Sequence, residues 1–203
     1  MSANEFWRQL VVAGHEGNET VARSGLAAPD PVARRFALGA LARMGALTDD
    51  DIVAAFADPD AAVRHRAVMM AAARPAVSLV AMLSDSDSTV VEVAAWAAGE
   101  QEVVSDDVFA LLCELAVSGT EALVREAAVA ALGAIGDERG LAAILAGCND
   151  KPPVRRRAVL ALAPFSGAAV DEALAAALND RDWQVRQAAE DLLPHSPQEA
   201  SQS

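Results

Sequence analysis

The residues of this chain that could do chemistry are few and widely spaced. His15 is followed by Glu16, a pair of ligands suited to a transition metal, but His65 and His195 have no glutamate beside them. A single His-Glu pair cannot supply the three ligands that such a metal site needs. We therefore expect no metal ion.

The two cysteines, Cys113 and Cys148, lie inside helical patterns and lack the spacing of a disulfide framework. They are typical of small buried hydrophobes in a reducing compartment. The sequence contains no evident signal peptide, membrane span, glycine-rich phosphate loop, or serine or cysteine with a base nearby. We predict a cytoplasmic protein that is not an enzyme, with no catalytic residue and no cofactor.

Arginine instead recurs at one place in a repeated pattern, Val-Arg-x-x-Ala-x-x-Ala-Leu-Gly. Successive copies are 30, 27, 34, 30 and 31 residues apart, and they start at Ala33, Val63, Val90, Val124, Val154 and Val185. A repeat of this length is typical of stacked repeat proteins. Within each copy the apolar residues fall on one stripe of a helix.

A second amphipathic segment precedes five of the six copies. These segments are Asp51–Ala57, Ala76–Leu83, Val108–Ala116, Leu141–Ala146 and Val170–Leu178. The composition, 53% hydrophobic with only 4% aromatic residues, favours helices that pack through small side chains. Each repeat is therefore predicted to be a hairpin of two helices.

The pattern resembles the HEAT-like repeats first noted in phycobilin lyases, over residues 18 to 193. The resemblance implies an all-α fold, a right-handed α-solenoid of about six HEAT-like hairpins whose second helices line a concave side. We expect one repeat domain, 1–193, followed by a disordered tail at 194–203. Within the domain we expect an N-terminal capping helix at 1–16 and repeats at about 18–45, 48–74, 75–101, 105–136, 137–165 and 167–193.

We call the first residue of each copy its anchor. In HEAT-like families an arginine directly after the anchor and an aspartate before it form a ladder between repeats. The resemblance assigns this structural role to Arg34, Arg64, Arg125, Arg155, Arg186, Asp30, Asp60, Asp150 and Asp182. The alternative is a row of guanidinium groups that binds anions. The third copy departs from the pattern, because Val91 replaces its arginine.

A candidate partner-binding surface lies at two other positions of the second helices, on the predicted concave face. The sixth position after the anchor carries the apolar side chains Met69, Trp96 and Leu160, and the second position carries Arg35, His65, Glu92, Glu126 and Arg156. Tryptophan and arginine are common anchors of protein interfaces. The alternative is that Trp96 only fills space between repeats.

The charge of the chain limits its partners. Sixteen basic against 29 acidic residues give a net charge of −13, which repels phosphate backbones and anionic lipids. We therefore predict no nucleic acid and no membrane as partner. The remaining partner is a protein or peptide, either a basic segment or an apolar peptide bound on the ridge formed by Met69, Trp96 and Leu160. The chain itself is expected to be a monomer or weak homodimer.

The predicted function is a non-enzymatic protein–protein interaction module, a scaffold or adaptor. The alternative is a phycobilin-lyase-like accessory protein that handles a chromophore or acts as a chaperone. The low aromatic content offers little for stacking a tetrapyrrole.

Overall fold

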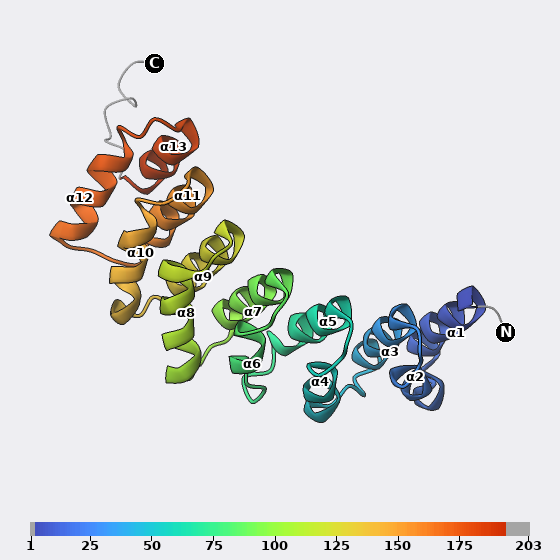
Figure 1. Ribbon diagram of the computed structural model, residues 1–203. Helices are drawn as coiled ribbons and strands as arrows, with labels where there is room; N and C mark the ends of the chain where they lie inside the picture. The colour runs from blue at the N-terminus through green and yellow to red at the C-terminus, as the bar shows by residue number, and fades with distance from the viewer. Residues whose placement is uncertain (1–2, 194–203) are drawn as a thin grey trace, which may run out of the picture. The chain divides into compact units, whose positions relative to one another are not determined.

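The computed structural model describes residues 3–193, and all regular structure in that range is helical (Figure 1). The prediction of an all-α fold is confirmed, whereas the expected tail at 194–203 lies outside the described residues. The helices are α1 Ala3–Glu16, α2 Glu19–Leu26, α3 Pro31–Arg43, α4 Asp49–Ala55, α5 Ala61–Ala71, α6 Val80–Leu83, α7 Ser88–Glu100, α8 Asp106–Ser118, α9 Ala122–Ile135, the 3-10 helix η1 Glu138–Gly140, α10 Leu141–Gly147, α11 Pro152–Ala161, α12 Ala168–Ala177 and α13 Trp183–Leu192.

The chain divides into two compact units, residues 1–111 and 112–203. In the first unit α1, α3, α5 and α7 pack side by side in one row, and α2, α4 and α6 pack on α3, α5 and α7 (Figure 1). Helix α1 packs on α3 from the side opposite α5, so it covers the end of the row. The core of this end consists of Leu10, Ala28, Ala33 and Ala37.

The second unit repeats the plan. Helices α9, α11 and α13 form the row, α10 packs on both α9 and α11, and α12 packs mainly on α13. Small residues allow close approach. A side chain on Gly133 of α9 would meet the Cβ of Ala161 on α11 at 2.6 Å. The six anchors all lie in second helices, α3, α5, α7, α9, α11 and α13, as the sequence predicts.

Aspartates start most of the second helices. Asp30, Asp60, Asp87 and Asp182 each precede the first helical residue, and each carboxylate accepts a hydrogen bond from the backbone N–H two residues later. Such capping satisfies a donor that a helix start leaves free. The capping aspartate therefore helps to fix the start of each of these four helices.

One first helix is much shorter than predicted. The segment 76–83 forms a helix only over α6, the four residues Val80–Leu83. Val77 and Leu79 are both buried although they are two residues apart. Both lie in the non-helical backbone that leads into α6.

Candidate functional site

The arginines that follow the anchors form ion pairs with the next repeat. Arg34 donates from Nε and Nη2 to the two carboxylate oxygens of Asp58, at 2.6 and 2.7 Å. Arg64 binds Asp85 in the same way at 2.7 and 2.8 Å, and the second unit contains the corresponding pairs Arg125–Asp150 and Arg155–Asp180. These bidentate ion pairs join consecutive repeats within each unit.

Each of these arginines also holds the turn before its own helix. Nη1 of Arg64 donates to the backbone carbonyl of Asp58, and Nη1 of Arg155 donates to that of Asp150. Arg186, in the last repeat, donates to the carbonyl of Asp180. In the four repeats with a bidentate pair, all three guanidinium nitrogens therefore donate to protein oxygens, which favours the structural ladder over a row of anion-binding groups.

The aspartates of the ladder differ from those expected. Of the four predicted, only Asp150 binds an arginine of the ladder. The other three, Asp30, Asp60 and Asp182, are capping residues, whose carboxylates accept backbone N–H groups of their own helices. The arginine partners Asp58, Asp85 and Asp180 each stand two residues before a capping aspartate, namely Asp60, Asp87 and Asp182.

The ladder stabilises the charged form of its carboxylates. Hydrogen bonds from the arginines lower the pKa of Asp85, Asp150 and Asp180 below the usual aspartate value, against the opposing effect of burial. For Asp58 burial is the largest influence and raises the pKa, but the guanidinium of Arg34 and the N–H of Asp60 outweigh it, so the pKa is lowered.

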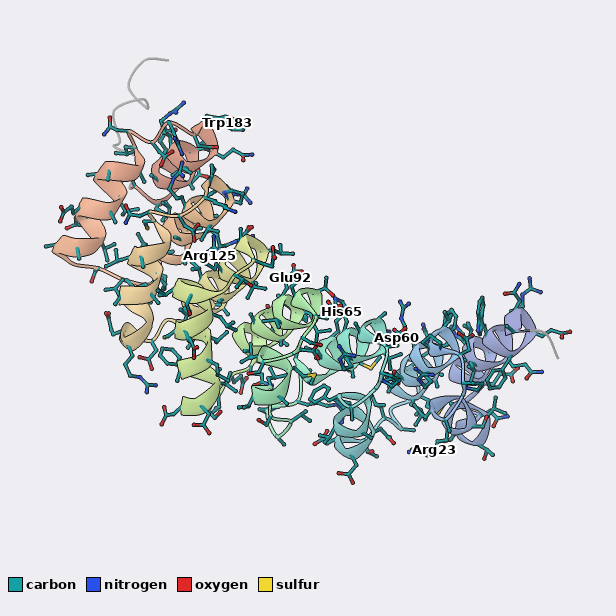
Figure 2. The ribbon with its side chains drawn as sticks, in the orientation of Figure 1. Arg23, Asp60, His65, Glu92, Arg125 and Trp183 are labelled. Atoms are coloured by element: carbon teal, nitrogen blue, oxygen red, sulfur yellow. The ribbon has the colours of Figure 1, made fainter. Side chains whose placement is uncertain are left out.

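Large apolar side chains remain exposed on the row of second helices in the first unit. Phe36 on α3, Met69 on α5 and Trp96 on α7 are 38%, 41% and 43% exposed. We call the side of α1, α3, α5 and α7 that carries them the second-helix face. Figure 2 shows His65 and Glu92 on α5 and α7, on the side away from α4 and α6.

The second-helix face contains a hollow of about 440 Å³ between α1, α3 and α5. Gly39 lies in it, at the repeat position that Met69 and Trp96 occupy on the next two second helices. Its lining combines four apolar side chains with three guanidinium groups, those of Val11, Val32, Phe36, Ala40, Arg35, Arg43 and Arg66. Of these lining residues the sequence predicted only Arg35 as a contact residue, although the missing side chain at Gly39 was a signal that space is left there.

The other predicted contact residues belong to the second unit. Leu160 is partly buried and packs against the core that includes Val159 and Val185. Arg156 and Glu126 are both partly exposed, and Glu126 lies 3.6 Å from Nε of Arg157. The expectation that Leu160 extends the ridge of Met69 and Trp96 stays a prediction.

The cysteines carry no sign of reactivity. Both are free, and burial raises the pKa of the Cys148 thiol to about 11 and also raises that of Cys113. Both thiols are therefore protonated at neutral pH. Over residues 3–193 no three side chains of His, Cys, Asp or Glu are grouped to hold a metal ion. None of the helices in this range is long and apolar enough to cross a membrane.

Solved structures with a similar fold are repeat proteins. A designed armadillo repeat protein, YIII(Dq)4CqI, is 18% identical with a TM-score of 0.57, and the match covers 85% of this chain and 97% of that one. A second design, YIII(Dq.V1)4CPAF in complex with peptide (KR)4, is 18% identical with a TM-score of 0.55, over 95% and 98% of the two chains. Human deoxyhypusine hydroxylase in complex with glycerol is 20% identical with a TM-score of 0.48, over 94% and 78%.

No curated protein matches the sequence. The likeness to the designed armadillo proteins shows the fold, an α-solenoid of helical repeats. The family model described as HEAT repeats matches residues 50–133, 76–163 and 112–194, which together exceed half of the chain. The match is to HEAT repeats in general and does not extend to the phycobilin-lyase type. The chain belongs to the HEAT-repeat family.

Proposed function

We propose that this protein is a non-enzymatic interaction module that binds a segment of another protein on the second-helix face of its first unit. The observation that carries the proposal is the exposure of Phe36, Met69 and Trp96 on three adjacent helices. Contiguous exposed apolar groups on a soluble protein commonly mark interaction sites. Polar and charged residues border them, as at the rim of an interface.

A non-catalytic role agrees with the state of the candidate reactive groups. Most of the ladder guanidinium groups are occupied by carboxylates and carbonyls, and the thiols are protonated. A repeat protein of similar fold has been solved with a bound peptide, (KR)4, so a stack of this kind can hold a peptide. Two free cysteines support a cytoplasmic setting for the interaction.

The experiment is a selection of peptides from a random display library on the immobilised full chain, followed by affinity measurements on the selected peptides. Trp96→Ala should weaken binding by about tenfold or more, since buried tryptophans dominate interface energies. Trp183→Ala is the matched control, because Trp183 is also exposed but lies at the start of α13 in the second unit. Its affinity should stay within about twofold of the wild type.

Circular dichroism establishes that both variants are folded. The proposal fails if the selection yields no peptide, or if the selected peptides bind Trp96→Ala and Met69→Ala as tightly as the wild type.

A further inference from the structure

Seven of the eight arginines of the first unit fall into two groups, and the eighth, Arg8, is exposed on α1. Those outside the hollow that pack against other helices, Arg23, Arg34, Arg64 and Arg74, each form an ion pair with an aspartate. Arg35, Arg43 and Arg66 line the hollow on the second-helix face, and none of them forms an ion pair with a carboxylate of residues 3–193. The hollow therefore carries three positive charges that no described carboxylate neutralises through an ion pair.

The hollow is fixed by the packing around it. Phe36 lies against Trp7, with ring centroids 6.3 Å apart, and the indole N–H of Trp7 donates to the carboxylate of Asp30, the cap of α3. The rim is thus tied to the start of the helix that carries Arg35 and Arg43. A preformed site loses less conformational entropy when a ligand binds.

The space itself comes from Gly39. A Cβ atom there would lie 3.4 Å from Nη2 of Arg66, so this guanidinium reaches across from α5 to the glycine. At the same repeat position, Met69 and Trp96 fill the surface of the next helices with large apolar side chains. The hollow therefore has an apolar floor beside a cationic edge, and no carboxylate among the described residues lines it.

We infer that this hollow binds an acidic segment of a partner protein, with an aliphatic or aromatic side chain seated against Phe36 and carboxylates paired with Arg35, Arg43 and Arg66. The inference rests on the proposed function and specifies the chemistry of the partner. Guanidinium groups pair with carboxylates through two parallel hydrogen bonds, and the chain uses this geometry in its own ladder. The net charge of −13 points to a basic partner, but the charge at the hollow is of the opposite sign.

The test uses the full chain and three short fluorescein-labelled peptides of equal length. They are repeats of Glu-Glu-Leu, Gln-Gln-Leu and Lys-Lys-Leu, and their binding is followed by fluorescence anisotropy. The acidic peptide should bind about tenfold more tightly than the neutral one, and the basic peptide should bind more weakly still. Added salt should reduce the difference, because the ion pairs are partly exposed.

Two substitutions test the location. Arg66→Glu should weaken the acidic peptide by about tenfold, whereas Arg181→Glu, which changes the net charge equally at an exposed arginine before α13, should change it less than about twofold. Gly39→Met fills the hollow without changing the charge and should also abolish the preference for the acidic peptide. Circular dichroism and thermal melting check that each variant is folded.

Several results would overturn the inference. If Arg66→Glu and Arg181→Glu weaken binding of the acidic peptide equally, the net charge and not the hollow determines the affinity. Equally tight, Arg66-dependent binding of a single-stranded oligonucleotide, or of phosphatidylcholine–phosphatidylserine vesicles, would assign the hollow to another class of anion. Preference for the neutral or basic peptide, lost in Trp96→Ala, would refute the acidic partner and leave the proposed function intact. If none of the three peptides binds and the library selection yields no peptide, both the inference and the proposed function are refuted.

Discussion

Arg64 and Arg66 stand two residues apart on α5 and meet different surroundings. Arg64 binds Asp85 and the carbonyl of Asp58, and its side chain is 13% exposed. Arg66 extends over Gly39 into the hollow. The same residue type therefore serves the fold at one position and is open to a partner at another.

This difference predicts unequal effects on stability. Arg64→Ala leaves the carboxylate of Asp85, which is 6% exposed, without its partner and should lower the free energy of unfolding by about 2–3 kcal/mol. Arg66→Ala on the same helix should change it by less than about 1 kcal/mol. Urea denaturation followed by circular dichroism measures both. Equal losses would show that the ladder pair contributes no more than an ordinary surface arginine.

The sequence pattern predicts the arginines of the ladder but not most of their partners. An aspartate three residues before the anchor, such as Asp60, stands where a helix cap is needed, and capping uses its carboxylate. The partner Asp58 stands five residues before the anchor, where the turn brings it to the preceding repeat. Distance along the chain alone cannot separate these two roles, because both residues are aspartates in the same turn.

At the scale of helices, neighbouring helices of the row pack closely at residues with small side chains or none. Gly133 on α9 faces Ala161 on α11 so closely that an added Cβ would lie 2.7 Å from the Cα of Ala161. Backbone atoms cannot move aside as a flexible side chain can. The two helices would have to separate.

Gly133→Ala should therefore lower the free energy of unfolding by about 1–3 kcal/mol, although alanine is the better helix former. Gly39→Ala is the matched control within α3, since its Cβ would meet only the flexible end of Arg66. It should be neutral, or stabilising by up to about 1 kcal/mol. Thermal melts of the two variants test the pair, and a stable Gly133→Ala would mean that α9 and α11 tolerate a wider spacing.

Periodicity predicts the second helices well because each contains a long apolar stripe, as in VREAAVAALGAIG from Val124. Periodicity predicts the first helices of the repeats less well. In the segment 76–83 the apolar residues suit a helix, yet the helix covers only Val80–Leu83, and Val77 and Leu79 are buried from non-helical backbone. The hollow could not be predicted from the sequence, because Val11 and Arg66 come from helices far apart in the chain and only packing brings them beside Gly39.

For the whole molecule, charge is distributed according to two separate needs. The aspartates of the ladder are held at the turns by ion pairs, while the three arginines of the hollow form no ion pair with a described carboxylate. An excess of acidic residues elsewhere gives the net charge of −13 and favours solubility. Local charge, not the total, decides which partner fits the face.

The ladder also sets how the molecule responds to acid. The pKa of Asp85 is lowered in the folded protein by the hydrogen bond from Arg64, and the pKa values of Asp58, Asp150 and Asp180 are lowered as well. The unfolded chain, with aspartate pKa values near about 3.9, then binds protons before the folded one does. The stability that these groups contribute is present above that value and is lost as the pH falls below it.

The free energy of unfolding, from urea titrations at successive pH values, should fall steeply below about pH 4. Asp85→Asn should be less stable at pH 7 but less sensitive to acid, so that its curve approaches the wild-type curve as the pH falls. Asp50→Asn removes an exposed carboxylate as the control for net charge, and a constant gap between the wild type and Asp85→Asn at all pH values would contradict the linkage.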